Sequence, residues 1–140
     1  MSLFSFSGKR PDNLGVKQGK LLACPNTPNC VCTQADASDK EHFIEPIVSS
    51  KAPADAIATL KTIIEGMERS QINEVANGYL YVEFASKLMG FVDDLEFYAG
   101  MPGLIHIRAA ARLGKSDLGV NRKRVETIRE QFQAASNAVT

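Results

Sequence analysis

A run of residues rich in hydrogen-bonding side chains, 116–121, leads directly into a basic segment near the C-terminus. Asp117 and Asn121 can accept hydrogen bonds from the free backbone amides of a helix start. The spacing therefore predicts a turn that ends at a helix capped by Asn121. A purely structural turn is one interpretation. The other places a bound anion on the exposed amides of the helix start, with Arg122 and Arg124 supplying positive charge.

Charged residues also recur at alternate positions in two strand-like segments, which places them on one face of a sheet. Asp94 and Glu96 belong to the first segment, and His106, Arg108 and Arg112 to the second. Planar guanidinium groups can hold a carboxylate or a phosphate, so this face is a candidate ligand-binding cluster under the N-terminal loop. The alternative is a solvated face with cross-strand ion pairs.

Asp93 falls on the opposite side of the same segment, among side chains that alternation assigns to the core. An unpaired carboxylate is costly there. We therefore expect either a bulge that redirects Asp93 or an ion pair with an arginine such as Arg112 or Arg122.

Three cysteines, Cys24, Cys30 and Cys32, lie in the proline-rich N-terminal part of the chain. Cys24 and Cys30 could form a disulfide, which an oxidising compartment would preserve. Their spacing is not a paired zinc motif, even with His42 downstream, so we expect no metal site and no cofactor. A nucleophilic cysteine with His42 or His106 as its base is a further interpretation, although no residue identifies an oxyanion site.

Periodicity indicates which elements position these groups. In chain order we expect a helix over residues 53–67, strands over 71–76, 79–86, 91–99 and 104–112, and a helix over 122–135. The fold class is α+β, with a four-stranded, mainly antiparallel sheet packed on one face by two helices and a long N-terminal loop region. We expect a mobile segment over residues 1–13, a single domain over 14–135 and a C-terminal tail over 136–140.

Composition limits the classes of partner. The chain has 140 residues, 16 Lys and Arg against 16 Asp and Glu, and a formal net charge of zero. It therefore lacks the excess positive charge that holds nucleic acid non-specifically, and we expect no nucleic-acid partner. No apolar run is long enough to span a bilayer, and no export signal is visible, so we expect a soluble, cytoplasmic protein.

Three motifs together resemble an uncharacterised family catalogued as domain of unknown function 1499. They are Cys-Pro-Asn-Thr-Pro-Asn-Cys-Val at 24–31, Phe-Val-Asp-Asp-Leu-Glu-Phe at 91–97, and the run from 116 to 129. By similarity, the family pattern includes Cys24, Pro25, Pro28, Asn29, Cys30, Asp93, Asp94, Glu96, Phe97, Arg108, Arg112, Gly114, Ser116, Asp117, Gly119, Asn121, Arg122, Arg124, Glu126 and Arg129. The resemblance implies no reaction, because no activity is established for the family.

The leading functional hypothesis is a non-enzymatic binding or assembly module that recognises a small anionic ligand or a protein partner through the acid and arginine residues. A hydrolase or thiol-dependent enzyme that uses Cys30 or His106 is the second hypothesis. The third is a purely structural ion-pair network that joins sheet, loop and helix.

Overall fold

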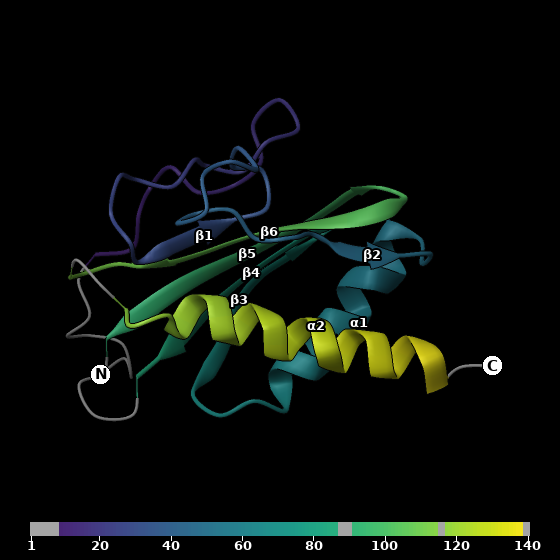
Figure 1. The fold of residues 1–140 in the computed structure, drawn as a ribbon. Helices are drawn as coiled ribbons and strands as arrows, with labels where there is room; N and C mark the ends of the chain where they lie inside the picture. The colour runs from purple at the N-terminus through teal and green to yellow at the C-terminus, as the bar shows by residue number, and fades with distance from the viewer. Residues whose placement is uncertain (1–8, 87–90, 115–116, 139–140) are drawn as a thin grey trace.

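The computed structural model describes residues 9–86, 91–114 and 117–138. They form three layers, with N-terminal loops on one side of a β-sheet and two helices on the other (Figure 1). The elements are β1 (Cys30–Cys32), β2 (Ile47–Ser49), α1 (Pro53–Glu65), β3 (Ser70–Ala76), β4 (Tyr79–Ala85), β5 (Val92–Met101), β6 (Gly103–Ala111) and α2 (Val120–Ala138). The predicted α+β class is confirmed.

The sheet has six strands, so the prediction of four is wrong. Its order is β1-β6-β5-β4-β3, and β2 also pairs with β6. The consecutive antiparallel pairing predicted for the four longer strands is confirmed. The two missed strands, β1 and β2, have three residues each, which is too short for an alternating pattern to be recognised. Both are strands because they hydrogen-bond to the backbone of β6. The connection between the strands expected over 79–86 and 91–99, residues 87–90, lies outside the described residues.

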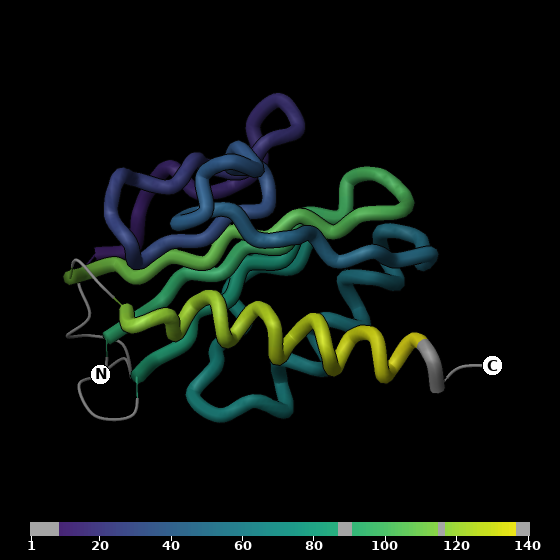
Figure 2. The backbone as a smooth tube through the Cα atoms, in the orientation of Figure 1, coloured from purple at the N-terminus to yellow at the C-terminus, as the bar shows by residue number. Residues whose placement is uncertain are grey.

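Both helices pack on the same face of the sheet (Figure 2). The core between these layers includes Leu60 and Ile64 of α1, Phe97 and Ile107 of the sheet, and Phe132 of α2, all fully buried. Burial of each large apolar side chain is worth about 1.5 to 3 kcal/mol. A slip of one residue would turn acids and arginines toward the helices, so this apolar face fixes the register of the strands.

The helix boundaries differ slightly from those predicted. Pro53 is the first residue of α1, where its missing N–H costs nothing, and the helix ends before Gly66. Helix α2 begins at Val120 and continues to Ala138, so it takes in part of the predicted tail. Of the predicted mobile segment, residues 1–8 lie outside the described residues, whereas 9–13 lie in the loop layer.

The second face of the sheet is covered by residues 9–24, which we call the cover. Leu21 is buried against the rings of Tyr79 and Tyr81 on β4. The side chain of Gln34 holds the cover from beyond β1, because its oxygen accepts from the Leu21 N–H at 2.8 Å and its nitrogen donates to the Gly19 carbonyl at 3.1 Å. Polar groups on this sheet face are therefore enclosed between two layers.

Candidate functional site

The enclosed face of the sheet gathers three carboxylates and two arginines from adjacent strands. Strand register places Glu83 opposite Asp94 and Glu96 opposite Arg108. Arg112 follows directly after β6, and its side chain is almost completely buried. We call Glu83, Asp94, Glu96, Arg108 and Arg112 the acid/arginine cluster. Alternation thus brings together the strand residues that the sequence singled out. The same alternation assigns Glu83 of β4 to this face, and the strand register agrees.

Arg112 joins two of the carboxylates. Its Nε and Nη2 donate to the two oxygens of Asp94, both at 2.8 Å, and Nη2 also donates to Glu83 Oε2. Burial alone would lower the pKa of Arg112, but the hydrogen bonds to Asp94 raise it above its ordinary value. Arg112 therefore stays charged, and its fork of donors is engaged by protein acceptors.

Two tyrosines complete the hydrogen bonds of the acids. The Tyr79 hydroxyl donates to Glu96 Oε2 at 2.6 Å, and the Tyr81 hydroxyl donates to Asp94 Oδ1. Burial, reinforced by these carboxylates, raises the pKa of both tyrosines, so they remain protonated donors. Each tyrosine hydroxyl therefore uses its one proton to hold a carboxylate, Tyr79 that of Glu96 and Tyr81 that of Asp94.

The cover contributes two further donors that sequence reasoning missed. Gly15, at a φ of 110° that favours glycine, turns its backbone N–H toward Glu96 Oε2 at 2.6 Å. Arg10 reaches across the face, and its Nη2 donates to Glu83 Oε1 at 2.5 Å. No local pattern marks either contact, because the partners are 81 and 73 residues apart in the chain.

Glu96 and Arg108 are buried neighbours that keep some hydrogen-bonding capacity. Among the described residues, neither Glu96 Oε1 nor Arg108 Nε has a hydrogen-bond partner. Burial raises the pKa of Glu96 and lowers that of Arg108, since each charge loses water. Within the cluster, Glu96 and Arg108 are therefore the residues with buried polar atoms that lack a hydrogen-bond partner among the described residues.

His106 lies on the same face but is not paired with an acid in any contact that the described residues show. Its Nδ1 lies 3.0 Å from the Thr33 hydroxyl oxygen, which also accepts from the Ile107 N–H at 3.0 Å. The Thr33 hydroxyl and the His106 ring are therefore hydrogen-bonded to each other. Burial and nearby Lys20 lower the pKa of His106, which favours the neutral ring.

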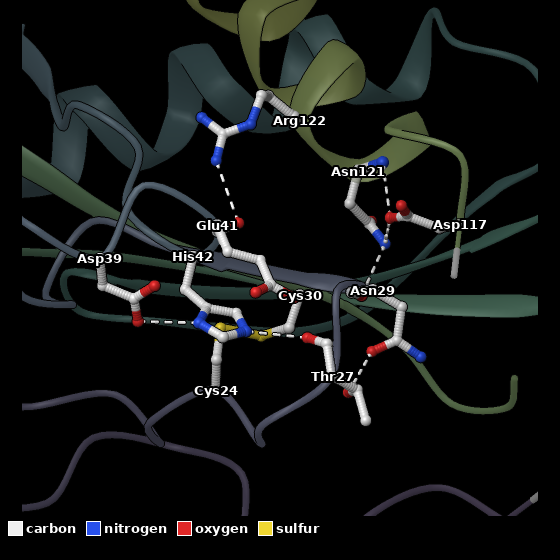
Figure 3. The surroundings of a disulfide bond; sticks show 10 residues. All are labelled: Cys24, Thr27, Asn29, Cys30, Asp39, Glu41, His42, Asp117, Asn121 and Arg122. Carbon is white, nitrogen blue, oxygen red and sulfur yellow. Dashed lines mark hydrogen bonds and ion pairs between the residues drawn. A yellow bond between two sulfur atoms is a disulfide. The ribbon is translucent and has the colours of Figure 1, made fainter. Parts of the chain in front are cut away.

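The predicted sites at the helix start lie apart from the acid/arginine cluster. The start of α2 is capped by the side chain of Asp117, not by that of Asn121 as predicted. The Asp117 carboxylate accepts from the N–H groups of Gly119 at 2.9 Å and Asn121 at 3.1 Å. The Asn121 side chain is fully buried and bridges Asp117 to the backbone of Asn29 (Figure 3). Two of the motifs noted in the sequence are thus in direct contact.

The basic residues of α2 bind other parts of the chain. Arg122 Nη2 donates to the carbonyl oxygens of Lys40 and Glu41, each at 3.3 Å. Figure 3 shows the contact with Glu41. Arg124 pairs with Asp93 at 2.7 Å. The carboxylate thus meets an arginine, as expected, but not Arg112 or Arg122, the two named as examples. Helical phase explains this, because positions 122 and 124 point in nearly opposite directions around the axis.

A model of the family described as "Protein of unknown function (DUF1499)" matches residues 20–132. The chain belongs to this family. Every member of the acid/arginine cluster lies inside the DUF1499 match, whereas Arg10 and Gly15 precede it. The search of curated proteins gives no match to this chain. No helix among the described residues is long and apolar enough to cross a membrane.

The Cys-Pro-Asn segment of the DUF1499 match is closed by a Cys24–Cys30 disulfide, which ties the end of the cover to β1. His42 braces this loop (Figure 3), since its Nδ1 lies 2.8 Å from Asp39 Oδ2 and its Nε2 lies 2.8 Å from the Thr27 carbonyl oxygen. Both neighbours accept, so both ring nitrogens donate. His42 is therefore held as an imidazolium ion, and its pKa is raised chiefly by Asp39.

The remaining cysteine, Cys32, is buried at the wall of a cavity of about 370 Å³ that Lys20, Cys24 and His42 also line. Burial raises the pKa of the Cys32 thiol, which makes it a poor nucleophile at neutral pH. Within the described residues, no three His, Cys, Asp or Glu side chains are grouped to hold a metal ion.

Proposed function

We propose that this chain is a non-enzymatic binding module that engages a partner protein through the acid/arginine cluster and the cover above it. The observation that carries the proposal is the position of Arg10. A peptide segment laid across the sheet already supplies a cation to a buried carboxylate of the cluster. A partner segment can make the same type of contact, because charge complementarity provides specificity at such a surface.

A small anionic ligand is supported less well than a partner protein. The guanidinium group of Arg112 already donates to Asp94 and Glu83, so an anion would compete with two carboxylates. An anion would also enter a face that holds three buried acids, which disfavours further negative charge.

An enzyme that uses Cys30 or His106 is disfavoured by the chemistry of these groups. The Cys30 sulfur is bonded to Cys24 and offers no thiolate while that bond persists. His106 is hydrogen-bonded to Thr33, and its lowered pKa leaves it a weak base. The ion pairs of the cluster can still act as a latch for the cover, and this structural role is compatible with binding.

A phage-displayed library of short random peptides, selected on the folded protein, tests the proposal. We expect the selected peptides to share basic side chains and to lose binding when Glu83→Gln removes a carboxylate from the cluster. Glu68→Gln is the matched control, because Glu68 is an exposed acid that pairs only with its neighbour Arg69 among the described contacts. Circular dichroism checks that both variants fold.

Two results would overturn the proposal. One is the absence of enrichment over an unrelated protein of similar charge. The other is a set of peptides that binds wild-type protein and Glu83→Gln equally, because the acid/arginine cluster would then play no part in recognition.

A further inference from the structure

The side chain of Arg10 lines a hollow of about 270 Å³ on the covered face of the sheet. The same hollow is lined by Asp12, Glu74, Tyr79 and Tyr81. Glu83, which Arg10 contacts, is almost completely buried. The hollow therefore combines aromatic and acidic lining residues with a cation that reaches a buried carboxylate.

The contacts of Arg10 match those by which proteins recognise a guanidinium group. Its Nη2 donates to Glu83 Oε1 at 2.5 Å, and its Cζ lies 5.6 Å from the centroid of the Tyr81 ring. Asn73 donates to the same Glu83 oxygen and fixes the carboxylate. A planar cation thus meets one charge-assisted hydrogen bond and one aromatic face.

The charge of the hollow favours a cation strongly. Arg10 is the one cation among the described residues that line it, and Asp12 and Glu74 are both acidic. Glu83, which Arg10 contacts, adds a third carboxylate, although it is shared with the buried Arg112. If Arg10 withdrew, the charged residues left lining the hollow, Asp12 and Glu74, would both be acidic, and another cation would be attracted to it.

Arg10 is held less firmly than the other arginines of this face. Half of its side chain, 51%, is exposed, whereas that of Arg112 is only 5% exposed. Exposed ion pairs contribute little, because water solvates both partners when they separate. Glu83 stays buried when Arg10 leaves, with 2% of its side chain exposed. Its Oε1 then keeps only the Asn73 donor, while Arg112 still holds Oε2. The geometry therefore makes Arg10 the exchangeable member of the pair.

We propose that this hollow is a binding site for the guanidinium group of an arginine side chain on a partner protein, and that Arg10 occupies the site within the chain until the partner displaces it. The inference rests on the proposed function and names its ligand chemistry. Arg10 acts as an internal competitor, so the affinity measured for an arginine ligand is reduced by the fraction of time that Arg10 fills the hollow.

The test uses N-acetyl-arginine methylamide, titrated into wild-type protein and into Arg10→Ala by isothermal calorimetry. We expect Arg10→Ala to bind this probe about fivefold more tightly than wild type, since it lacks the competing exposed ion pair. Lys9→Ala removes the neighbouring exposed cation and should leave the affinity unchanged. The citrulline analogue, which has nearly the same shape without the charge, should bind neither protein.

The outcomes separate this inference from the proposed function. Equal affinity of wild type and Arg10→Ala for the arginine probe, or equal binding of the citrulline analogue, would overturn the inference. If the peptide library still yielded basic peptides that depend on Glu83, the binding function would stand without competition by Arg10. If it yielded none, and the probe bound neither protein, both proposals would fail.

Discussion

Asp93 and Asp94 are neighbours in sequence, yet their carboxylates lie on opposite faces of the sheet and meet different arginines. Asp94 points under the cover and pairs with Arg112, with side-chain exposures of 2% and 5%. Asp93 points toward α2 and pairs with Arg124, with exposures of 13% and 15%. The covered face thus buries its charge more completely than the helix face does.

The two environments handle a buried acid in different ways. Asp94 accepts hydrogen bonds from both Arg112 and Tyr81, and Arg112 in turn binds a second acid, Glu83. Burial raises the pKa of Asp93, and Arg124 opposes that rise. A charged layer inside a small domain therefore needs acids and arginines that share partners. Asp93, at the edge of an apolar core, is held by Arg124 with support from Asn121.

The largest effect is expected for Arg112→Gln, which removes the cation from two buried acids. Loss of one partner of a buried pair typically costs about 3 to 5 kcal/mol, because the remaining charge stays desolvated. We expect a decrease of this size in the free energy of unfolding, measured by urea denaturation. Arg69→Gln breaks an exposed pair with Glu68 and should change stability very little. A decrease below about 1 kcal/mol for Arg112→Gln would show that the covered face does not depend on this pair.

A smaller loss is expected for Arg124→Gln on the helix face. The Arg124 guanidinium lies 2.7 Å from Asp93 and over the ring of Phe84, with its Cζ 4.6 Å from the centroid. Hydrogen bonds to charged groups contribute about 1.5 to 3 kcal/mol, and we expect a decrease in that range. Arg124→Lys keeps the charge and should recover part of the loss. If Arg124→Gln proved as damaging as Arg112→Gln, the contrast between the faces would be wrong.

Alternation accounts for what the sequence could predict about these faces. Because side chains on a strand point alternately to either side, Asp94 and Glu96 could be assigned to one face with Arg108, and strand register agrees. Helical periodicity placed both helices over the other face. Both signals depend only on residues close together in the sequence, so they can be recognised without knowledge of the tertiary structure.

The remaining features depend on contacts between distant residues. Arg10 and Gly15 reach the sheet from a segment with no periodicity, and no local pattern predicts their partners. Arg124 was not predicted to meet Asp93, since that contact requires the rotation of α2 about its axis, which its packing on the sheet sets. The ligand-binding role assigned to the acid/arginine residues stays a prediction.

The Cys24–Cys30 bond fixes the end of the cover to β1, so its removal tests how far the covered face depends on the loop layer. A disulfide that closes so short a loop is expected to contribute about 2 kcal/mol. Cys24→Ser with Cys30→Ser should lower the free energy of unfolding by that amount, and a reducing agent should do the same to wild type. Equal stability of the double variant and wild type under oxidising conditions would contradict this prediction.

Alkylation with iodoacetamide in denaturant, added as cells are lysed, gives a second readout of the same bond. Denaturation exposes the Cys30 thiol, which is buried in the folded protein, and the free cysteine Cys32 is the internal control. The reducing cytosol usually keeps such pairs as thiols, so labelled Cys24 and Cys30 are expected if the protein is cytoplasmic. Protected Cys24 and Cys30 would contradict the cytoplasmic location predicted from the sequence.

The smallest effect is expected from the titration of His42, which braces the disulfide loop. The hydrogen bond to Asp39, followed by that to the Thr27 carbonyl, raises the pKa of His42. A histidine with a raised folded-state pKa contributes its full stability below its unfolded pKa of about 6.5. That contribution is lost as the pH rises through the folded-state pKa.

We therefore expect the free energy of unfolding to fall by up to about 1 kcal/mol as the pH rises above about 6.5. His42→Gln should lack this fall, because glutamine does not titrate. His106 cannot produce the same signal, since its pKa is lowered and its titration destabilises the fold only on the acid side. If the free energy of unfolding fell equally in His42→Gln, another group would be titrating. The contacts of His42 with Asp39 and Thr27 would then have no electrostatic role in stability.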